Sequence, residues 1–195
     1  MPNRLTNGGH QYVAVRLLGI DAGFTAMGVV VAEDDRIIYA ATCRTEKNAG
    51  GKKGVRVADD DAERAQQLGR FLLVTIGEWH PAGAVVELPS GGAQGARANR
   101  AMGMSTGIVT TALEATGLAA EWVTPAAVKL AAAGKRDASK GAVAGAVGKR
   151  FTWTCDLPKT KAEQEHIFDA AGAILAAQDG TMIRALRARE AGATA

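Results

Sequence analysis

The sequence predicts one α/β domain in which helices cover a mixed β-sheet. Three apolar runs near the N-terminus are joined by short turns, which is typical of an antiparallel meander. Two shorter apolar runs come later, and each follows a stretch with helical periodicity. The chain has 195 residues, which is enough for one domain with a substantial hydrophobic core. Strands that come first and then alternate with helices predict a mixed sheet with helical layers.

Five apolar runs have the length of a strand and are bounded by turn residues. They span residues 13–21, 28–32, 36–43, 82–87 and 121–123. The first run ends in Asp21 and the fourth ends in Glu87. A charge at the end of a buried strand is costly to desolvate unless something pairs with it. Asp21 is therefore either an ordinary turn aspartate or part of a site, and its own stretch does not decide between them.

Helical periodicity and capping residues mark the remaining elements. The predicted helices span residues 59–79, 96–116, a segment that starts at Thr124-Pro125, a segment from Ser139 to Arg150, and residues 162–178. Thr124 and Ser139 are good N-cap residues, and Pro125 is well tolerated in a first helical turn. The helix over 96–116 is rich in small residues, which permit close backbone approach.

Breaker-rich segments separate these elements and set the predicted domain limits. Residues 1–12 are polar and Gly-rich and are expected to form a flexible N-terminal arm. Residues 13–180 form the predicted domain, and residues 181–195 are expected to be a basic C-terminal tail. The predicted loops include residues 44–57, 88–95 and 151–161.

The overall composition is that of a globular protein with a mild excess of positive charge. There are 23 basic and 20 acidic residues, for a net charge of +3. No apolar run approaches the roughly 20 residues needed to cross a bilayer, and the N-terminus lacks a signal-peptide pattern. Cys43 and Cys155 lie far apart without a CxxC motif. We therefore expect no membrane partner and a cytoplasmic location.

The basic residues are concentrated in a few stretches of the chain. These are residues 44–56, 97–100, 129–140 and 184–189. Such segregation fits a polyanion partner, although charge runs are more often solvated faces.

Three acidic groups and one histidine are candidates for a common site. Asp21 and Glu87 converge at one edge of the sheet if their strands are neighbours. His166 and Asp169 are three residues apart on the last predicted helix, and so share a face with Gly172, Ala173 and Ala176. Those small residues would let the helix approach the sheet. Glu163 and Glu165 are expected to be solvated, and His166 alone would more often be a hydrogen-bonded structural histidine.

Convergent acidic groups without basic partners repel one another, and hard divalent cations relieve that repulsion. Mg²⁺ and Mn²⁺ favour carboxylate and water ligands. Two such ions can clamp a phosphodiester, with one activating water and the other stabilising the leaving oxygen. The residues therefore predict a two-ion site with Mg²⁺ or Mn²⁺.

Four segments together resemble the RuvC-type Holliday junction resolvases of the RNase H-like nuclease superfamily. They are LLGIDAGFTAMGVVV, AVVELP, VTPAAVKLAAAGKRDASKGAVAGAV and HIFDAAGAILAA, in the family's order and spacing over about residues 15–178. The resemblance implies an RNase H-like mixed five-stranded sheet, three strands antiparallel and two parallel, flanked by helices. It implies a crossover junction endodeoxyribonuclease that resolves a four-way DNA junction by two paired cuts. It also implies a homodimer and no small-molecule cofactor.

The resemblance also implies roles for particular residues. The implied metal ligands are Asp21, Glu87, His166 and Asp169, and Lys129 is the implied catalytic lysine. Basic loops are expected to follow the phosphate backbone of DNA. The expected DNA contacts are Lys140, Lys135, Arg136, Lys52, Lys53, Arg97 and Arg100.

This sequence departs from the family in the loop after the second acid. Family members often carry an aromatic wedge residue there, whereas here Leu88 is the only apolar candidate. The helix over residues 97–116 is the candidate dimer interface, and its packing on the sheet is an equally good interpretation.

Three alternative functions remain open. The first is cleavage of other branched or hybrid nucleic acids, and the second is a non-catalytic DNA-binding module of the same fold. The third is an actin-like kinase, because LLGID also resembles the nucleotide-binding start of those proteins.

Overall fold

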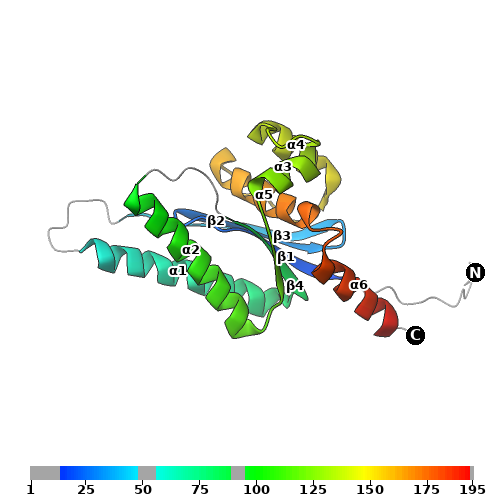
Figure 1. The fold of residues 1–195 in the computed structure, drawn as a ribbon, viewed down its shortest axis with the longest axis horizontal. Helices are drawn as coiled ribbons and strands as arrows, with labels where there is room; N and C mark the ends of the chain where they lie inside the picture. Colours follow the sequence, from blue (N-terminus) through cyan, green and yellow to red (C-terminus); the bar gives the residue numbers. More distant parts are fainter. Residues whose placement is uncertain (1–13, 48–55, 89–94, 194–195) are drawn as a thin grey trace, which may run out of the picture.

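A six-stranded sheet forms the centre of the protein, with helices on both of its faces (Figure 1). The computed structural model describes residues 14–47, 56–88 and 95–193. The strand order is β5-β4-β1-β2-β3-β6. Strands β1 (Arg16–Asp21), β2 (Ala26–Glu33) and β3 (Arg36–Arg44) form the predicted antiparallel meander.

The later strands extend the meander on both sides. Strand β4 (Gly83–Glu87) pairs in parallel with β1, and β5 (Ala120–Val123) pairs in parallel with β4. The sheet also has a sixth strand, β6 (Thr152–Trp153), which pairs in parallel with β3. The prediction of five strands was wrong at this point, because residues 151–161 were interpreted as a loop. A two-residue strand is set by its pairing with Arg36 and Ile37, and its local pattern is too short to indicate it.

The two faces of the sheet bury separate clusters of apolar side chains. Because successive strand residues point to opposite faces, Leu17 and Val85 lie in one cluster and Leu18 and Val86 lie in the other. Helices α1 (Val57–Trp79) and α2 (Ala96–Thr116) cover the second cluster. In Figure 1 they run side by side along one face of the sheet.

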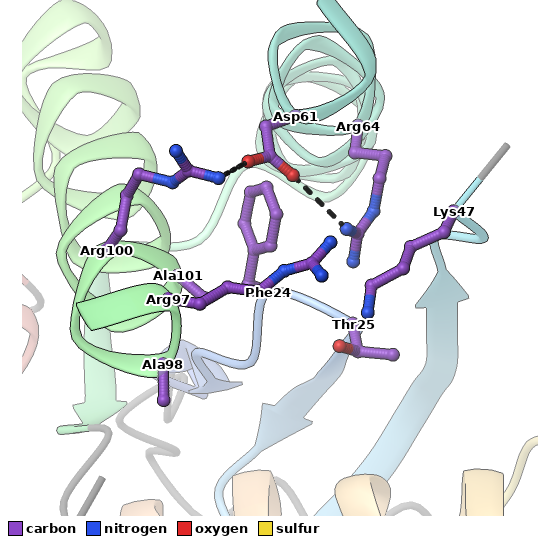
Figure 2. A pocket seen from close by; sticks show the side chains of 9 residues that line it. All are labelled: Phe24, Thr25, Lys47, Asp61, Arg64, Arg97, Ala98, Arg100 and Ala101. Atoms are coloured by element: carbon purple, nitrogen blue, oxygen red, sulfur yellow. Dashed lines mark hydrogen bonds and ion pairs between the residues drawn. The ribbon is translucent and has the colours of Figure 1, made fainter. Parts of the chain in front are cut away.

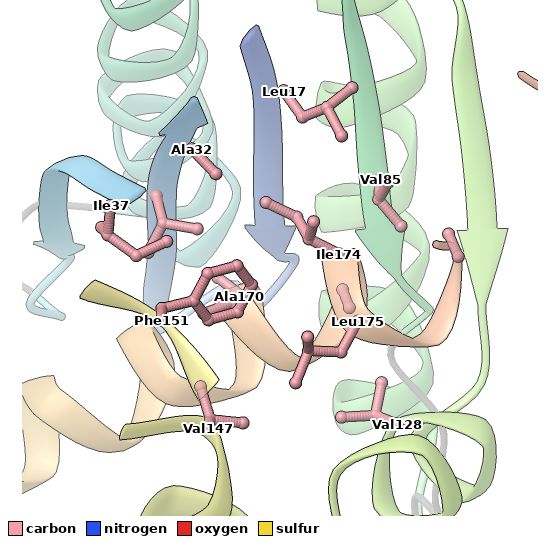
Figure 3. Close-up of a cluster of buried hydrophobic side chains, with 14 of the residues drawn as sticks. Leu17, Ala32, Ile37, Val85, Val128, Val147, Phe151, Ala170, Ile174 and Leu175 are labelled. Atoms are coloured by element: carbon pink, nitrogen blue, oxygen red, sulfur yellow. The ribbon is translucent and has the colours of Figure 1, made fainter. Parts of the chain in front are cut away.

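The opposite face is covered by α5 (Lys161–Ala176), which crosses β1, β2, β3 and β4. Helices α3 (Pro125–Ala133) and α4 (Lys140–Arg150) pack on the outer side of α5 (Figure 3). Thr124 and Ser139 cap α3 and α4, since each hydroxyl accepts a hydrogen bond from a first-turn N–H. Both predicted helix starts are confirmed.

Helix α5 lies very close to the sheet because two strand residues have no side chain. A Cβ atom on Gly19 would overlap the carbonyl oxygen of Ala170, and one on Gly28 would overlap the carbonyl oxygen of His166. Gly172 was expected to face the sheet, but it faces Val128 of α3. The glycines that permit this close approach are therefore on the strands.

The segment predicted as a basic C-terminal tail contains a helix, α6 (Thr181–Ala193), which the sequence analysis did not predict. Ile183 is fully buried, and Met182 and Leu186 pack against Gly83 at the start of β4. The N–H of Met182 donates to a carboxylate oxygen of Glu121 at 2.8 Å. The helical spacing of Ile183 and Leu186 was a usable signal that Asp179-Gly180 masked, because that pair is typical of a helix end.

None of the helices in the described part of the chain is both long enough and apolar enough to cross a membrane. The predicted arm over residues 1–12 lies outside the described residues, as do most of the predicted loops over residues 44–57 and 88–95. The domain limits at residues 13 and 180 stay a prediction.

Candidate active site

Asp21 and Glu87 are direct neighbours at one edge of the sheet. They are the last residues of the parallel strands β1 and β4, and they are register partners. Asp21 lies two residues after Gly19, and Glu87 lies two residues after Val85, so both side chains are on the face that α5 covers. The predicted convergence of the two carboxylates is confirmed.

Helix α5 adds His166 and Asp169 to these acids. The Nδ1 atom of His166 lies 2.6 Å from the Oδ2 atom of Asp21. Gly28, the register partner of Asp21 on β2, is the residue against which the backbone of His166 rests. Asp169 is one helical turn further along, and its charge acts on Glu87. The absence of a side chain at Gly28 thus determines how close the histidine comes to Asp21.

The electrostatics of the site show how closely the acids are grouped. Burial, together with the charges of Asp21 and Asp169, raises the pKa of Glu87 to about 8. Burial and the charge of Asp21 raise the pKa of Asp169 to about 6. The hydrogen bond to Asp21 raises the pKa of His166. Without a bound cation, simultaneous ionisation of Asp21, Glu87 and Asp169 is therefore disfavoured at neutral pH.

Two lysines on neighbouring helices act on these acids. The charges of Lys140, at the start of α4, and Lys129, on α3, each oppose the rise in the pKa of Glu87. The Nζ atom of Lys140 lies 3.1 Å from a carboxylate oxygen of Glu165. Glu165 is exposed, as expected, but it holds this lysine beside the acids. The structure therefore groups Lys129 and Lys140 with the four predicted ligands.

The donors at this site suit a hard divalent cation. The Oε2 atom of Glu87 is buried and has no hydrogen-bond partner within the described residues. Carboxylate oxygens and an imidazole nitrogen are ligand types that Mg²⁺ and Mn²⁺ accept. In the described ranges no three His, Cys, Asp or Glu side chains are already arranged around a common ion position. Holding an ion therefore requires these side chains to turn toward it.

Other predicted DNA contacts lie elsewhere. Lys135 and Arg136 are exposed in the turn between α3 and α4. Arg97 and Arg100 are on α2, and they line a cavity together with residues of the β1–β2 turn and of α1. Lys52 and Lys53 lie outside the described residues.

Two features were not predicted from the sequence: the positioning role of Gly28 and the burial of the Arg64 charge. Gly28 had a usable signal, because a glycine inside an apolar strand often marks close approach of another backbone. Arg64 had none, since an arginine on an amphipathic helix is usually solvated.

The sheet order, with α5 across it and acids ending the adjacent strands β1 and β4, defines an RNase H-like fold. Thermus thermophilus RuvC in complex with a Holliday junction substrate has this fold, with a TM-score of 0.67 and 22% identity over 83% of this chain and 92% of that chain. A second Thermus thermophilus RuvC structure gives a TM-score of 0.62 and 23% identity over 86% of this chain and 98% of that one. The yeast mitochondrial Holliday junction resolvase Ydc2 gives a TM-score of 0.56 and 14% identity over 92% and 86% of the two chains.

No protein-family model matches the sequence, and no curated protein matches it significantly. At these identities the likeness to the resolvases establishes the fold. The predicted resemblance is therefore confirmed at the level of the RNase H-like fold, with a sixth strand added.

Proposed function

We propose that this protein is a metal-dependent endodeoxyribonuclease that resolves four-way DNA junctions. The observation that carries the proposal is the pairing of Asp21 with Glu87 at the ends of adjacent strands, with His166 hydrogen-bonded to Asp21. The fold that positions them is shared with a RuvC structure bound to a Holliday junction. Branched DNA is accordingly the proposed partner.

In this proposal Asp21, Glu87, His166 and Asp169 hold two Mg²⁺ or Mn²⁺ ions. Such ions, when bound, supply an activated water and neutralise charge on the phosphodiester. The residues of the chain do the rest. His166 orients the carboxylate of Asp21 through their hydrogen bond, and the close fit at Gly28 keeps the imidazole in place. Lys129 and Lys140 stabilise the negative charge that develops on the phosphate.

We further propose that the protein acts as a homodimer, because resolving a junction requires two paired cuts. An apolar groove of about 370 Å³ runs between α1 and α2. It is lined by Leu73, Gly107, Ile108 and other small or apolar residues, and the side chain of Leu73 is exposed. Part of the predicted interface helix, α2, lines this groove. We propose a second copy of the chain as its occupant.

The Asp21→Asn variant tests the proposed activity. We expect Mg²⁺-dependent cleavage of a synthetic four-way junction to fall at least 100-fold, because the variant loses the charge of one metal ligand. Junction binding should be retained, because asparagine has nearly the same shape as aspartate and can still form hydrogen bonds. Asp35→Asn is the matched control, since Asp35 is exposed in the β2–β3 turn at the other end of β2. Full cleavage by Asp21→Asn would exclude this site as the catalytic centre.

Substrate panels and calorimetry separate the proposal from its alternatives. A Y-fork, a flap and an RNA–DNA hybrid are compared with the junction, and preferential cleavage of one of these would reassign the substrate. Mn²⁺ titration by calorimetry tests the non-catalytic alternative. Absence of both metal binding and cleavage would favour a DNA-binding module.

A further inference from the structure

A cavity of about 280 Å³ lies beside the β1–β2 turn, on the face of the sheet that α1 and α2 cover (Figure 2). Four segments of the chain form it, and one of them is the stretch after β3 that carries Lys47. Phe24 and Thr25 come from the turn that follows Asp21, Asp61 and Arg64 come from α1, and the first turns of α2 close the other side. Its charged lining residues are Lys47, Asp61, Arg64, Arg97 and Arg100. Four cations therefore face one carboxylate.

The single carboxylate is already engaged by two of these cations. Asp61 forms an ion pair with Arg100 through one oxygen, and its other oxygen lies 3.5 Å from the Nη1 atom of Arg64. The side chains of Asp61 and Arg64 are only 9% and 6% exposed. Asp61 thus holds α1 and α2 together and is not free to neutralise the remaining charges.

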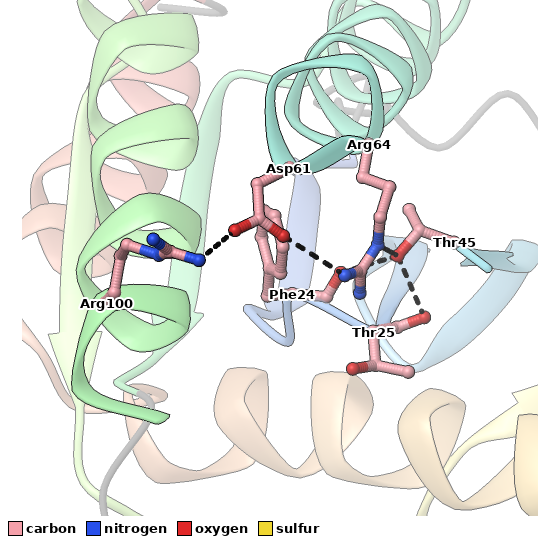
Figure 4. Close-up of polar contacts among 6 residues, drawn as sticks. All are labelled: Phe24, Thr25, Thr45, Asp61, Arg64 and Arg100. Atoms are coloured by element: carbon pink, nitrogen blue, oxygen red, sulfur yellow. Dashed lines mark hydrogen bonds and ion pairs between the residues drawn. The ribbon is translucent and has the colours of Figure 1, made fainter. Parts of the chain in front are cut away.

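Arg64 is held rigidly on three sides (Figure 4). Its Nε atom donates to the Thr45 hydroxyl at 3.0 Å, and its guanidinium lies 4.5 Å from the centre of the Phe24 ring. The Thr45 hydroxyl in turn donates to the carbonyl oxygen of Phe24 at 2.8 Å. The wall of the cavity is therefore fixed to the turn that follows Asp21.

Within the described ranges, neither Lys47 nor Arg97 forms an ion pair, so the positive charges of both side chains are unbalanced. Both side chains extend toward Thr25 and Arg64 in Figure 2. Helix α2 begins beside them without a side-chain cap, so its positive N-terminus adds to the same field. The cavity is consequently preorganised for an anion with several oxygen acceptors.

We propose that this cavity binds a backbone phosphate of the DNA substrate, separate from the phosphate that is cut. The acids face α5, whereas the ring of Phe24 lies on the α1–α2 side, so the two sites are on opposite sides of one short turn. A phosphate bound here would fix the register of a strand that crosses this edge toward Asp21. The proposal rests on the proposed function. It makes Lys47 and Arg97 the direct contacts and Arg100 a positioning residue that acts through Asp61.

The first test compares DNA affinity in EDTA, where no cleavage occurs. We expect the Lys47→Ala/Arg97→Ala double variant to bind a four-way junction about 10-fold more weakly than wild type at 0.1 M salt. The slope of log affinity against log salt should fall by about 1 to 2. Arg189→Ala is the control, because Arg189 is exposed on α6, which packs at the opposite end of β4. Circular dichroism verifies that each variant is folded.

The second test identifies the ligand as a backbone phosphate. Single phosphates of the junction are replaced by neutral methylphosphonates, one position at a time. We expect one position to weaken wild-type binding several-fold while leaving the double variant unchanged, because the contact is already lost. Inorganic phosphate and a mononucleotide serve as competing probes.

The outcomes separate this proposal from the proposed function. If wild type binds the junction and the double variant matches it in affinity and salt slope, the cavity is not a DNA site, and the proposed function stands. If inorganic phosphate or the mononucleotide stabilises wild type alone and no methylphosphonate position is coupled, the cavity binds a free phosphate, and our assignment is overturned. If wild type binds no DNA, both proposals are wrong.

Discussion

Replacing Glu87 by glutamine should stabilise the metal-free protein at high pH. The carboxylate of Glu87 is buried beside Asp21, its Oε2 atom has no hydrogen-bond partner in the described residues, and its pKa is raised from 4.5 to about 8. Glutamine has nearly the same shape but cannot ionise. The substitution therefore removes a cost that the fold bears only when Glu87 is charged.

The size and direction of the effect follow from this pKa. A raised pKa means that the stability contributed by protonated Glu87 is fully present below about pH 4.5 and is lost as the pH rises through about 8. One pKa unit corresponds to about 1.4 kcal/mol, so ionised Glu87 costs at most roughly 5 kcal/mol. Rotation of the carboxylate and entry of water relieve part of this cost. We expect the variant to exceed wild type by about 2 kcal/mol at pH 9.

Thermal unfolding in EDTA at pH 5 and at pH 9 measures this difference. About 2 kcal/mol corresponds to a gain of roughly 4–8 °C in Tm for a chain of this length. The gain should be small at pH 5, and Asp35→Asn should show no comparable pH-dependent gain. Adding Mn²⁺ at pH 8 should stabilise wild type more than Glu87→Gln, because bound metal offsets the repulsion. An equal gain at pH 5 and pH 9 would refute the reasoning.

Two further substitutions test how the site is assembled. Gly28→Ala should lower junction cleavage at least 10-fold and destabilise the fold by about 1–3 kcal/mol, because its Cβ would push α5 and His166 away from Asp21. Gly77→Ala is the control, since nothing in the described residues lies within 4 Å of a Cβ there and Gly77 does not line the proposed dimer groove; equal loss of cleavage in both would contradict the argument. Gly107→Glu should leave the monomer folded but dissociate a dimer that uses the α1–α2 groove, as measured by sedimentation. An unchanged dimer would exclude that interface.

Much of the fold can be read from the sequence because it depends on local pattern. Alternating and continuous apolar runs indicated β1 to β5, and helical spacing with cap residues such as Thr124 and Ser139 indicated α1 to α5. The acids Asp21 and Glu87 were identifiable because each ends an apolar strand. Strand β6 was missed because it is set by pairing with β3, which is far away in the sequence. Helix α6 was missed because Asp179-Gly180 is typical of a helix end.

Only the tertiary structure decided how these parts meet. The parallel register of β1 with β4 makes Asp21 and Glu87 neighbours, and no local pattern encodes that register. The missing side chain at Gly28 brings His166 to hydrogen-bonding distance of Asp21. The basic cavity needs the β1–β2 turn, α1 and α2 at once, so Arg64 became recognisable only when Asp61, Thr45 and Phe24 were in place around it. The chemistry of each residue is local, but its burial and its neighbours come from packing between distant segments.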